Sequence, residues 1–190
     1  MIPGPDYPDH PGRPARAPVR DRRQTGVARG MAAALVVVLL TLAVGWSVGS
    51  PLSPTDRVLR AVAAATVAAL WLAAAIGRVA ALRFDSPADI DAAASGSADS
   101  PRLAIANAVL RNTLEQVVLA VPAYLALAWV VEGSGAMIPM LAALFSAGRT
   151  LFWAHYARGA AARSFGFALT FYSSVAALVI VLVALVGRLV

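Results

Sequence analysis

Two clusters of polar residues interrupt the apolar stretches of this sequence, and each could bind a ligand. The first lies within residues 111–116, where Arg111, Asn112 and Glu115 follow Ala108 at helical spacing. The four positions recur at i, i+3, i+4 and i+7, so they share one face of a helix. Two interpretations are open: a buried polar site for a ligand, or a structural clamp in which Arg111 pairs with Glu115 one turn away.

The second cluster is rich in arginine. Arg149, Trp153 and Tyr156 recur at i, i+4 and i+7, which places them on one face of a helix. Arg158 and Arg163 follow in a short loop. Guanidinium groups gathered without carboxylates require an anion, which could be a carboxylate, a thiolate or a lipid phosphate.

The helices that must position these clusters are predicted from hydropathy. The chain has 190 residues, of which 59% are hydrophobic, and its mean hydropathy is +0.72. These values are typical of an integral membrane protein. A helix that crosses a bilayer needs about 20 residues, and five apolar segments reach that length. They lie at residues 31–50, 57–83, 102–131, 136–157 and 164–187. We therefore predict an all-α membrane protein.

The N-terminal part of the chain divides into a tail and a helix. Residues 1–30 are rich in proline and arginine and lack hydrophobic periodicity, so we expect a disordered basic tail in the cytoplasm. Residues 31–50 are uncharged and exceed the apolar core of about 7–15 residues found in a cleaved signal peptide. We predict an additional transmembrane helix that is retained. Arg22 and Arg23 could belong to a twin-arginine export signal, but a basic flank is the simpler interpretation.

The distribution of arginines predicts the orientation in the membrane. With the tail in the cytoplasm and five alternating spans, the outer side receives only Arg57, Arg60 and Arg188. The positive-inside rule then favours a multi-pass protein of the cell membrane with a cytoplasmic N-terminus. In this orientation the two polar clusters lie at the same membrane face, which favours a shared site. Arg78, near the end of its span, either extends to the interface or points into that site.

The composition argues against two other kinds of partner. The 16 basic residues are all arginine and outnumber the 10 acidic ones, for a formal net charge of +6. They are spread over the tail and the helix ends, with no basic stripe interleaved with aromatics, so we predict no nucleic-acid partner. The chain has no cysteine, and its two histidines are far apart. We therefore predict no metal site.

Together the two clusters resemble the signature of the membrane-associated proteins in eicosanoid and glutathione metabolism, the MAPEG family. This family includes microsomal glutathione transferases and the leukotriene and prostaglandin E synthases. Asn112 and Glu115 resemble the N-x-x-E motif of the family's second helix, and residues 149–163 resemble its third helix and the following loop. The resemblance covers about residues 58–190. The chain resembles a divergent bacterial-type member with an extra N-terminal helix.

The resemblance implies a left-handed four-helix transmembrane bundle over residues 57–190 that assembles as a homotrimer. It implies that glutathione, or another low-molecular-weight thiol, binds between subunits near the cytoplasmic face. Arg163 would be catalytic, because a cation beside the sulfur favours the thiolate. The residues implied in cofactor binding are Arg111, Asn112, Glu115, Arg149, Tyr156 and Arg158. The chain departs from the family pattern at Ala108, Gln116 and Phe152, and each change weakens glutathione recognition while leaving the fold unaffected.

Two functions follow as alternatives. The first is a thiol transferase or peroxidase of the detoxifying kind, which acts on lipophilic substrates that arrive from the membrane lipids. The second is a non-catalytic membrane protein that keeps the bundle and uses its arginines as lipid-phosphate anchors or structural clamps. The first alternative requires one cavity on which four side chains converge: Asn112, Glu115, Tyr156 and Arg163.

Overall fold

Five long helices make up most of the chain. The computed structural model describes residues 22–49, 52–90 and 98–190. The long helices are α1 (Arg22–Ser47), α2 (Pro54–Phe84), α5 (Pro101–Val130), α6 (Met137–His155) and α7 (Ala160–Leu189). Each is long and apolar enough to cross a membrane, α6 being counted together with the 3-10 turn η2 (Tyr156–Arg158) that follows it. The described ranges contain no strand, so the prediction of an all-α membrane protein is confirmed.

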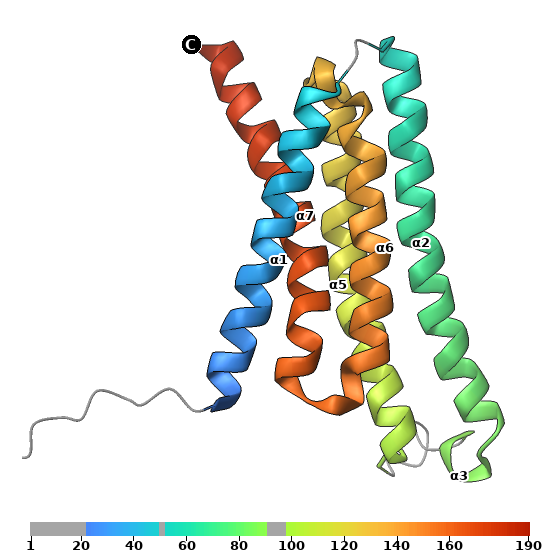
Figure 1. Cartoon of the computed structure of the whole chain (residues 1–190). Helices are drawn as coiled ribbons and strands as arrows, with labels where there is room; N and C mark the ends of the chain where they lie inside the picture. Colours follow the sequence, from blue (N-terminus) through green and yellow to red (C-terminus); the bar gives the residue numbers. More distant parts are fainter. Residues whose placement is uncertain (1–21, 50–51, 91–97) are drawn as a thin grey trace, which may run out of the picture.

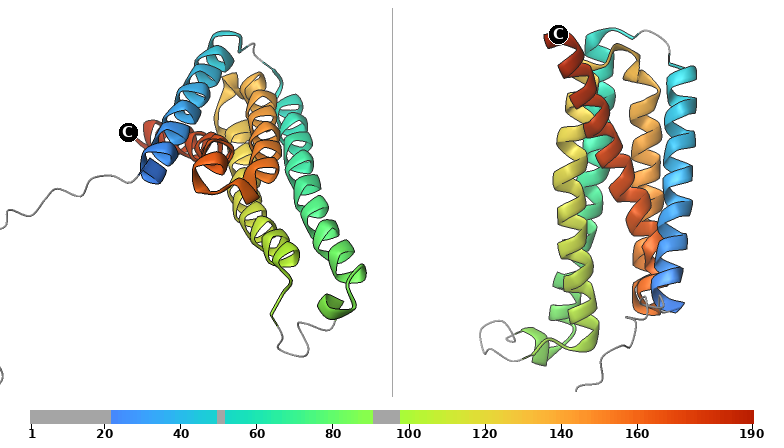
Figure 2. Two further views of the ribbon diagram at one scale, coloured as in Figure 1. Left: turned by 60° about the horizontal axis from the view of Figure 1, so that its bottom comes forward. Right: turned by 90° about the vertical axis from the view of Figure 1, so that its left-hand side faces the viewer.

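Helices α2, α5, α6 and α7 form a bundle, and α1 lies on its outside. Figure 1 shows α1 beside α7, on the side of the molecule away from α2. The right-hand view of Figure 2 shows α1 running along α6 and α7. All four helices contribute buried side chains to the bundle core, and its largest members, with no exposed surface, include Tyr124 and Leu127 of α5 and Leu141 and Phe145 of α6. The predicted extra N-terminal helix is therefore present as a separate element outside the bundle.

Serine–proline pairs begin two of the helices. The Oγ of Ser53 accepts a hydrogen bond from the backbone N–H of Asp56 (3.1 Å), and the Oγ of Ser100 accepts one from Leu103 (3.3 Å). Each serine is followed by proline at a position where a helix has no N–H to lose. These local signals define where α2 and α5 start.

A short helix, α3 (Pro87–Ile90), lies between α2 and α5. The backbone N–H of Ser100 donates to Oδ1 of Asp89 at 2.9 Å. This hydrogen bond and one from the Ser100 hydroxyl favour the charged carboxylate, so they hold the pKa of Asp89 below its usual value. The contact ties α3 to the first residue before α5.

Arginines stabilise the opposite end of the bundle, where α5 ends and η1 (Glu132–Gly135) leads into α6. The last carbonyl groups of a helix have no partner within it, and cations there also complement the helix dipole. All three arginines expected on the outer side donate to such groups: Arg57 Nε to Ala128 O (3.0 Å), Arg60 Nη1 to Gly135 O (2.7 Å) and Arg188 Nη2 to Val130 O (2.6 Å). The guanidinium groups of these arginines are therefore hydrogen-bonded to the main chain of the protein.

The helix boundaries differ from those predicted mainly at the N-terminus. Helix α1 begins at Arg22, so the expectation of a disordered tail was wrong for residues 22–30. Contacts with α7 stabilise this extension, since Gly26 and Gly30 lie directly against it. The rest of the expected tail, residues 1–21, lies outside the described residues, as does the loop segment 91–97. The four remaining spans begin and end within four residues of the predicted positions.

Candidate functional site

Arg149 lies at the centre of the polar interior. It belongs to α6 and has no exposed surface. Its Nη1 donates to Oδ1 of Asn112 on α5 at 2.8 Å, and its Nε donates to Oγ1 of Thr170 on α7 at 3.2 Å. Its Cζ also lies 4.6 Å from the ring centroid of Phe152, in a cation–π contact. Because a buried charge must be compensated, this one side chain joins three helices.

One donor of Arg149 remains without an acceptor. Its Nη2 is buried and makes no hydrogen bond to any residue that the structure describes. A charged donor that is buried without an acceptor is destabilising. A carbonyl or anionic group of a ligand that reached this atom would therefore bind favourably.

Two glycines allow α6 and α7 to approach closely beside Arg149. A Cβ at Gly148 would overlap Oγ1 of Thr170, and a Cβ at Gly166 would lie 2.5 Å from the backbone nitrogen of Phe152. Neither position accepts a side chain unless the helices move apart. Small residues permit such close packing between transmembrane helices. This packing brings Thr170 within hydrogen-bonding distance of Arg149.

Asn112 connects the buried arginine to the surface of α5. Its Oδ1 accepts from Arg149, which has no acceptor of its own, so the amide nitrogen must face the other way. That Nδ2 donates to Oε2 of Glu115 at 3.3 Å. Arg111 and Glu115 are both exposed on α5. The prediction of an ion pair between them was wrong, because these two described residues do not contact each other and Glu115 instead accepts from Asn112. The partner of Glu115 is therefore the amide of Asn112 and not the guanidinium of Arg111.

The turn between α6 and α7 brings Tyr156 and Arg163 together. Gly159 has φ 100°, a left-handed conformation that favours glycine, and it reverses the chain. As a result, Cζ of Arg163 lies 4.3 Å from the ring centroid of Tyr156. The tyrosine ring in turn packs edge-on against Phe152 at 5.2 Å. The cation of Arg163 is thus held over an aromatic face at the start of α7.

A cavity of about 340 Å³ opens beside these side chains, and we call it the Arg163 cavity. Polar groups from α5, η2 and α7 line one part of it, and apolar side chains from α1, α6 and α7 line the rest. Its polar lining consists of Asn112, Tyr156, Arg163 and Ser164. Its apolar lining consists of Val27, Met31, Phe152, Ala160 and Phe167. The cavity can therefore accommodate a molecule with a polar end and an apolar end.

The predicted site residues divide into three groups in the structure. Asn112, Tyr156 and Arg163 line the cavity, and Arg149 lies behind them, bonded to Asn112. Glu115 reaches this group only through Asn112. The last two, Arg111 and Arg158, are exposed and do not line it.

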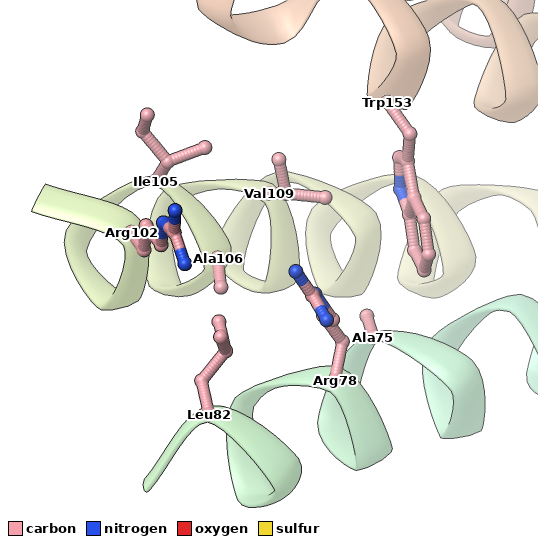
Figure 3. Close-up of a pocket in the computed structure, with 8 residues that line it drawn as sticks. All are labelled: Ala75, Arg78, Leu82, Arg102, Ile105, Ala106, Val109 and Trp153. Atoms are coloured by element: carbon pink, nitrogen blue, oxygen red, sulfur yellow. The ribbon is translucent and has the colours of Figure 1, made fainter. Parts of the chain in front are cut away.

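A second cavity, of about 280 Å³, lies between α2 and α5. Figure 3 shows Arg78 projecting from α2 towards α5, with Arg102 on α5 near one end of the cavity and Trp153 at the other. The Nε1 of Trp153 donates to Oγ1 of Thr113 at 3.4 Å. Thr113 is the residue that follows Asn112 on α5. Arg78, which the sequence suggested for a shared polar site, therefore belongs to a different cavity from Arg163.

Several residues around Arg149 were not predicted from the sequence. Thr170 carries the second hydrogen bond, and Gly148 and Gly166 make that bond possible. The only available signal for Thr170 was a polar residue within an otherwise apolar span. Val27 lies in the expected tail and Met31 at the start of the first predicted span, so nothing in their spacing connected them with Arg163.

The model of the MAPEG family matches residues 61–183 of the chain. The match includes most of α2, all of α5 and α6, and α7 up to its last two turns. Helix α1 lies wholly outside it. No curated protein and no solved structure matches the chain.

Proposed function

The chain belongs to the MAPEG family, and from this we propose that it is a membrane-embedded transferase that joins a low-molecular-weight thiol, such as glutathione, to lipophilic electrophiles. One observation carries the proposal: Asn112 of α5 lines a single cavity together with Tyr156 and Arg163, which follow much later in the sequence. The cavity thus contains three of the four side chains that the catalytic alternative required, and the fourth, Glu115, is connected to it through the amide of Asn112. The cavity is also amphipathic, as a site shared by a charged thiol and an apolar substrate must be.

The residues present suit a thiolate cofactor. Arg163 would stabilise the sulfur anion, because a nearby cation favours the deprotonated form. Its guanidinium makes no hydrogen bond or ion pair with any side chain in the described ranges, so its donors are available to a ligand. The amide of Asn112 would bind a carbonyl or carboxylate group of the cofactor, and the buried Arg149 would act on it through its hydrogen bond to Asn112. Tyr156 would contribute its hydroxyl, whereas Phe152 has none to offer.

The proposed reaction transfers the thiol sulfur to carbon. The thiol first loses its proton to solvent, and the thiolate attacks the electrophilic carbon. The carbon–sulfur bond forms as the leaving group departs with its bonding electrons. Peroxide reduction at the same site would consume two thiols and release an alcohol, water and a disulfide. Either reaction would detoxify reactive lipophilic compounds.

We also propose that the active form is a homotrimer, since MAPEG proteins generally are trimeric. Arg111, Glu115, Val118 and Trp129 lie exposed along α5. A charged group that faces lipid within a span costs about 2.5–3.5 kcal/mol, so a covering neighbour would stabilise this face. The Arg163 cavity is near the lower limit of the roughly 300–1,000 Å³ typical of ligand pockets, so a second subunit would also enlarge the site.

The arginine distribution supports a cytoplasmic N-terminus. The Arg163 cavity lies at the end of the bundle that contains the start of α1 and the α6–α7 turn (Figure 1). We propose that the protein lies in the cell membrane with this end facing the cytoplasm, where low-molecular-weight thiols are kept reduced.

A specific observation favours the non-catalytic alternative for part of the network. Arg149 joins α5, α6 and α7, as a structural clamp would. Arg78 and Arg102 line the cavity between α2 and α5 and make no hydrogen bond to the described residues there, so either could bind lipid phosphate. This alternative explains those three arginines, but it does not explain why Arg163, Tyr156 and Asn112 share a cavity.

The proposed function is tested with the full chain purified in detergent. Binding of glutathione, and separately of cysteine, is measured by calorimetry, and conjugation to chlorodinitrobenzene is followed by absorbance. We expect saturable binding of at least one thiol and a conjugation rate above the uncatalysed rate. If neither thiol binds and no conjugation occurs, the protein is not a thiol transferase and the non-catalytic alternative is preferred.

A further inference from the structure

Helix α1 provides a wall of the Arg163 cavity. Val27 and Met31 line the cavity together with Asn112, Tyr156 and Arg163. The two apolar residues lie outside residues 61–183, to which the family model matches. This part of the cavity wall is therefore an addition that the chain makes to the four-helix bundle.

The N-terminal half of α1 is packed closely against the beginning of α7. A Cβ at Gly26 would lie 2.8 Å from the Cβ of Ala161, and a Cβ at Gly30 would overlap the Oγ of Ser164. Backbone therefore meets side chain directly at both glycines. Val27 and Met31 each follow one of these glycines. The close contact between α1 and α7 therefore determines how far the two side chains extend into the cavity.

The contact continues along α1 beyond the cavity. Ala34 and Val38 have no exposed surface and pack in one cluster with Ala168 and Leu169 of α7. Four successive turns of α1 are thus held against α7. A wall held over this length has a defined position, which a loosely attached helix would not have.

We propose that Met31 and Val27 determine the size of the electrophile that reaches Arg163. The identity of that molecule as an electrophile rests on the function proposed above. Arg163 and Asn112 would hold the polar thiol, which leaves the apolar part of the cavity, including the α1 wall, for the second substrate. The cavity then selects compact lipophilic electrophiles, and truncating the α1 side chains admits bulkier ones.

Apolar pockets discriminate by size to a limited extent. A single methylene changes selectivity by about 10–200-fold. Met31→Ala removes more than one methylene equivalent, although the flexible methionine can also move aside. We therefore expect Met31→Ala to raise selectivity for a bulky over a compact molecule by about tenfold or more.

The first test measures access to the cavity without relying on catalysis. The chain has no cysteine, so Ser164→Cys provides a single thiol in the cavity lining. Its alkylation rate is measured with N-methylmaleimide and with the bulky pyrenyl maleimide, in the full chain reconstituted in lipid. Adding Met31→Ala should raise the bulky-to-small rate ratio about tenfold, and Val27→Ala should change it in the same direction. The matched control is Leu40→Ala, an exposed position on the opposite face of α1, which should leave the ratio unchanged. An unchanged ratio in both the Met31→Ala and the Val27→Ala proteins would overturn the proposal.

The second test asks whether α1 occupies the position that the proposal needs. Gly26→Cys with Ala161→Cys should form a disulfide on mild oxidation, since a small movement gives the required Cβ separation of about 3.5–4.5 Å. Loss of reactivity towards a maleimide polymer reports the bond. Gly77→Cys with Ala161→Cys is the control, because a Cβ at Gly77 meets nothing within 4 Å. Failure of the first pair to cross-link would show that α1 is not docked and would also overturn the proposal.

A third measurement separates this inference from the proposed function. Conjugation is compared between chlorodinitrobenzene and the same ring bearing a decyl ester. If the wild type conjugates both and Met31→Ala does not shift the preference towards the ester, the inference is wrong while the proposed function stands. If the wild type conjugates neither, the proposed function fails, and the alkylation ratios alone decide whether α1 limits access to the cavity.

Discussion

Replacing Arg149 by methionine tests whether its hydrogen bonds stabilise the bundle. Methionine keeps much of the length and apolar volume of the side chain but removes every donor. The change deletes the bonds to Asn112 at 2.8 Å and to Thr170 at 3.2 Å. Thr170 keeps a bond from its hydroxyl to the carbonyl of Gly166 at 3.0 Å, so it stays satisfied. Oδ1 of Asn112 loses the only donor that it has among the described residues.

The size of the effect follows from these two bonds. A hydrogen bond to a charged group contributes about 1.5–3 kcal/mol, so the pair contributes about 3–6 kcal/mol. Removing a buried charge returns part of this, because its desolvation penalty disappears as well. We expect a net loss of about 2–4 kcal/mol, which corresponds to a decrease of about 5–10 °C in Tm. Arg149→Lys should lie between wild type and Arg149→Met, because a single ammonium lacks the fork that reaches two acceptors.

The assay is thermal unfolding of the detergent-purified proteins, followed by circular dichroism and by the loss of the folded peak in gel filtration. Arg158→Met is the matched control, since Arg158 is exposed and should lose no stability. A double-mutant cycle with Asn112→Ala should give a coupling energy of about 1 kcal/mol or more, as for residues that share a network. Equal Tm values for Arg149→Met and wild type would refute the reasoning and show that the guanidinium is not needed to join the three helices.

Three further outcomes are expected. Arg163→Ala should reduce the conjugation rate and the ultraviolet absorbance of the bound thiolate by more than it reduces thiol affinity, because the charge that Arg163 stabilises is largest in the reacting state. An unchanged rate would show that another arginine stabilises the thiolate. Arg57→Ala should lower the Tm, because its buried guanidinium donates to Ala128 O and to Leu52 O, whereas Arg158→Ala, at an exposed position, should not; equal values would show that these carbonyls need no cap. The folded-state pKa of Asp89 is lowered, so its contribution to stability is present above the usual pKa of about 3.9 and is lost as the pH falls through the folded value. Wild type should therefore have a higher Tm than Asp89→Asn at pH 7, and the difference should disappear in acid; a difference that persists at pH 2 would contradict this.

The transmembrane helices could be predicted because hydropathy is a local property. Each span of about 20 apolar residues is readable without knowledge of its neighbours, and Ser53 and Ser100 marked two helix starts through their own hydrogen bonds. The start of α1 could not be read in this way. Residues 22–30 lack hydrophobic periodicity and contain two glycines, which locally disfavour a helix, and their contact with α7 accounts for the helix there.

The candidate site was predictable in its residue types but not in its pairings. Helical spacing correctly placed Asn112 and Glu115 on one face, and the same spacing suggested Arg111 as the partner of Glu115. The structure pairs Asn112 with both Glu115 and Arg149, because α6 lies close enough to α5 to supply a guanidinium. A choice between two partners, one local and one 37 residues away in sequence, depends on helix packing that no local pattern encodes.

The arginines of this chain differ in what their charge is free to do. Arg57, Arg60 and Arg188 donate to main-chain carbonyls at one end of the bundle. Arg149 uses two of its nitrogen atoms in joining three helices. Arg163 is held by the ring of Tyr156, a contact to a π face that occupies none of its in-plane N–H donors. It also lines the Arg163 cavity, which has an apolar wall. Among these arginines, Arg163 is therefore the one that we propose to stabilise an anion that forms during a reaction.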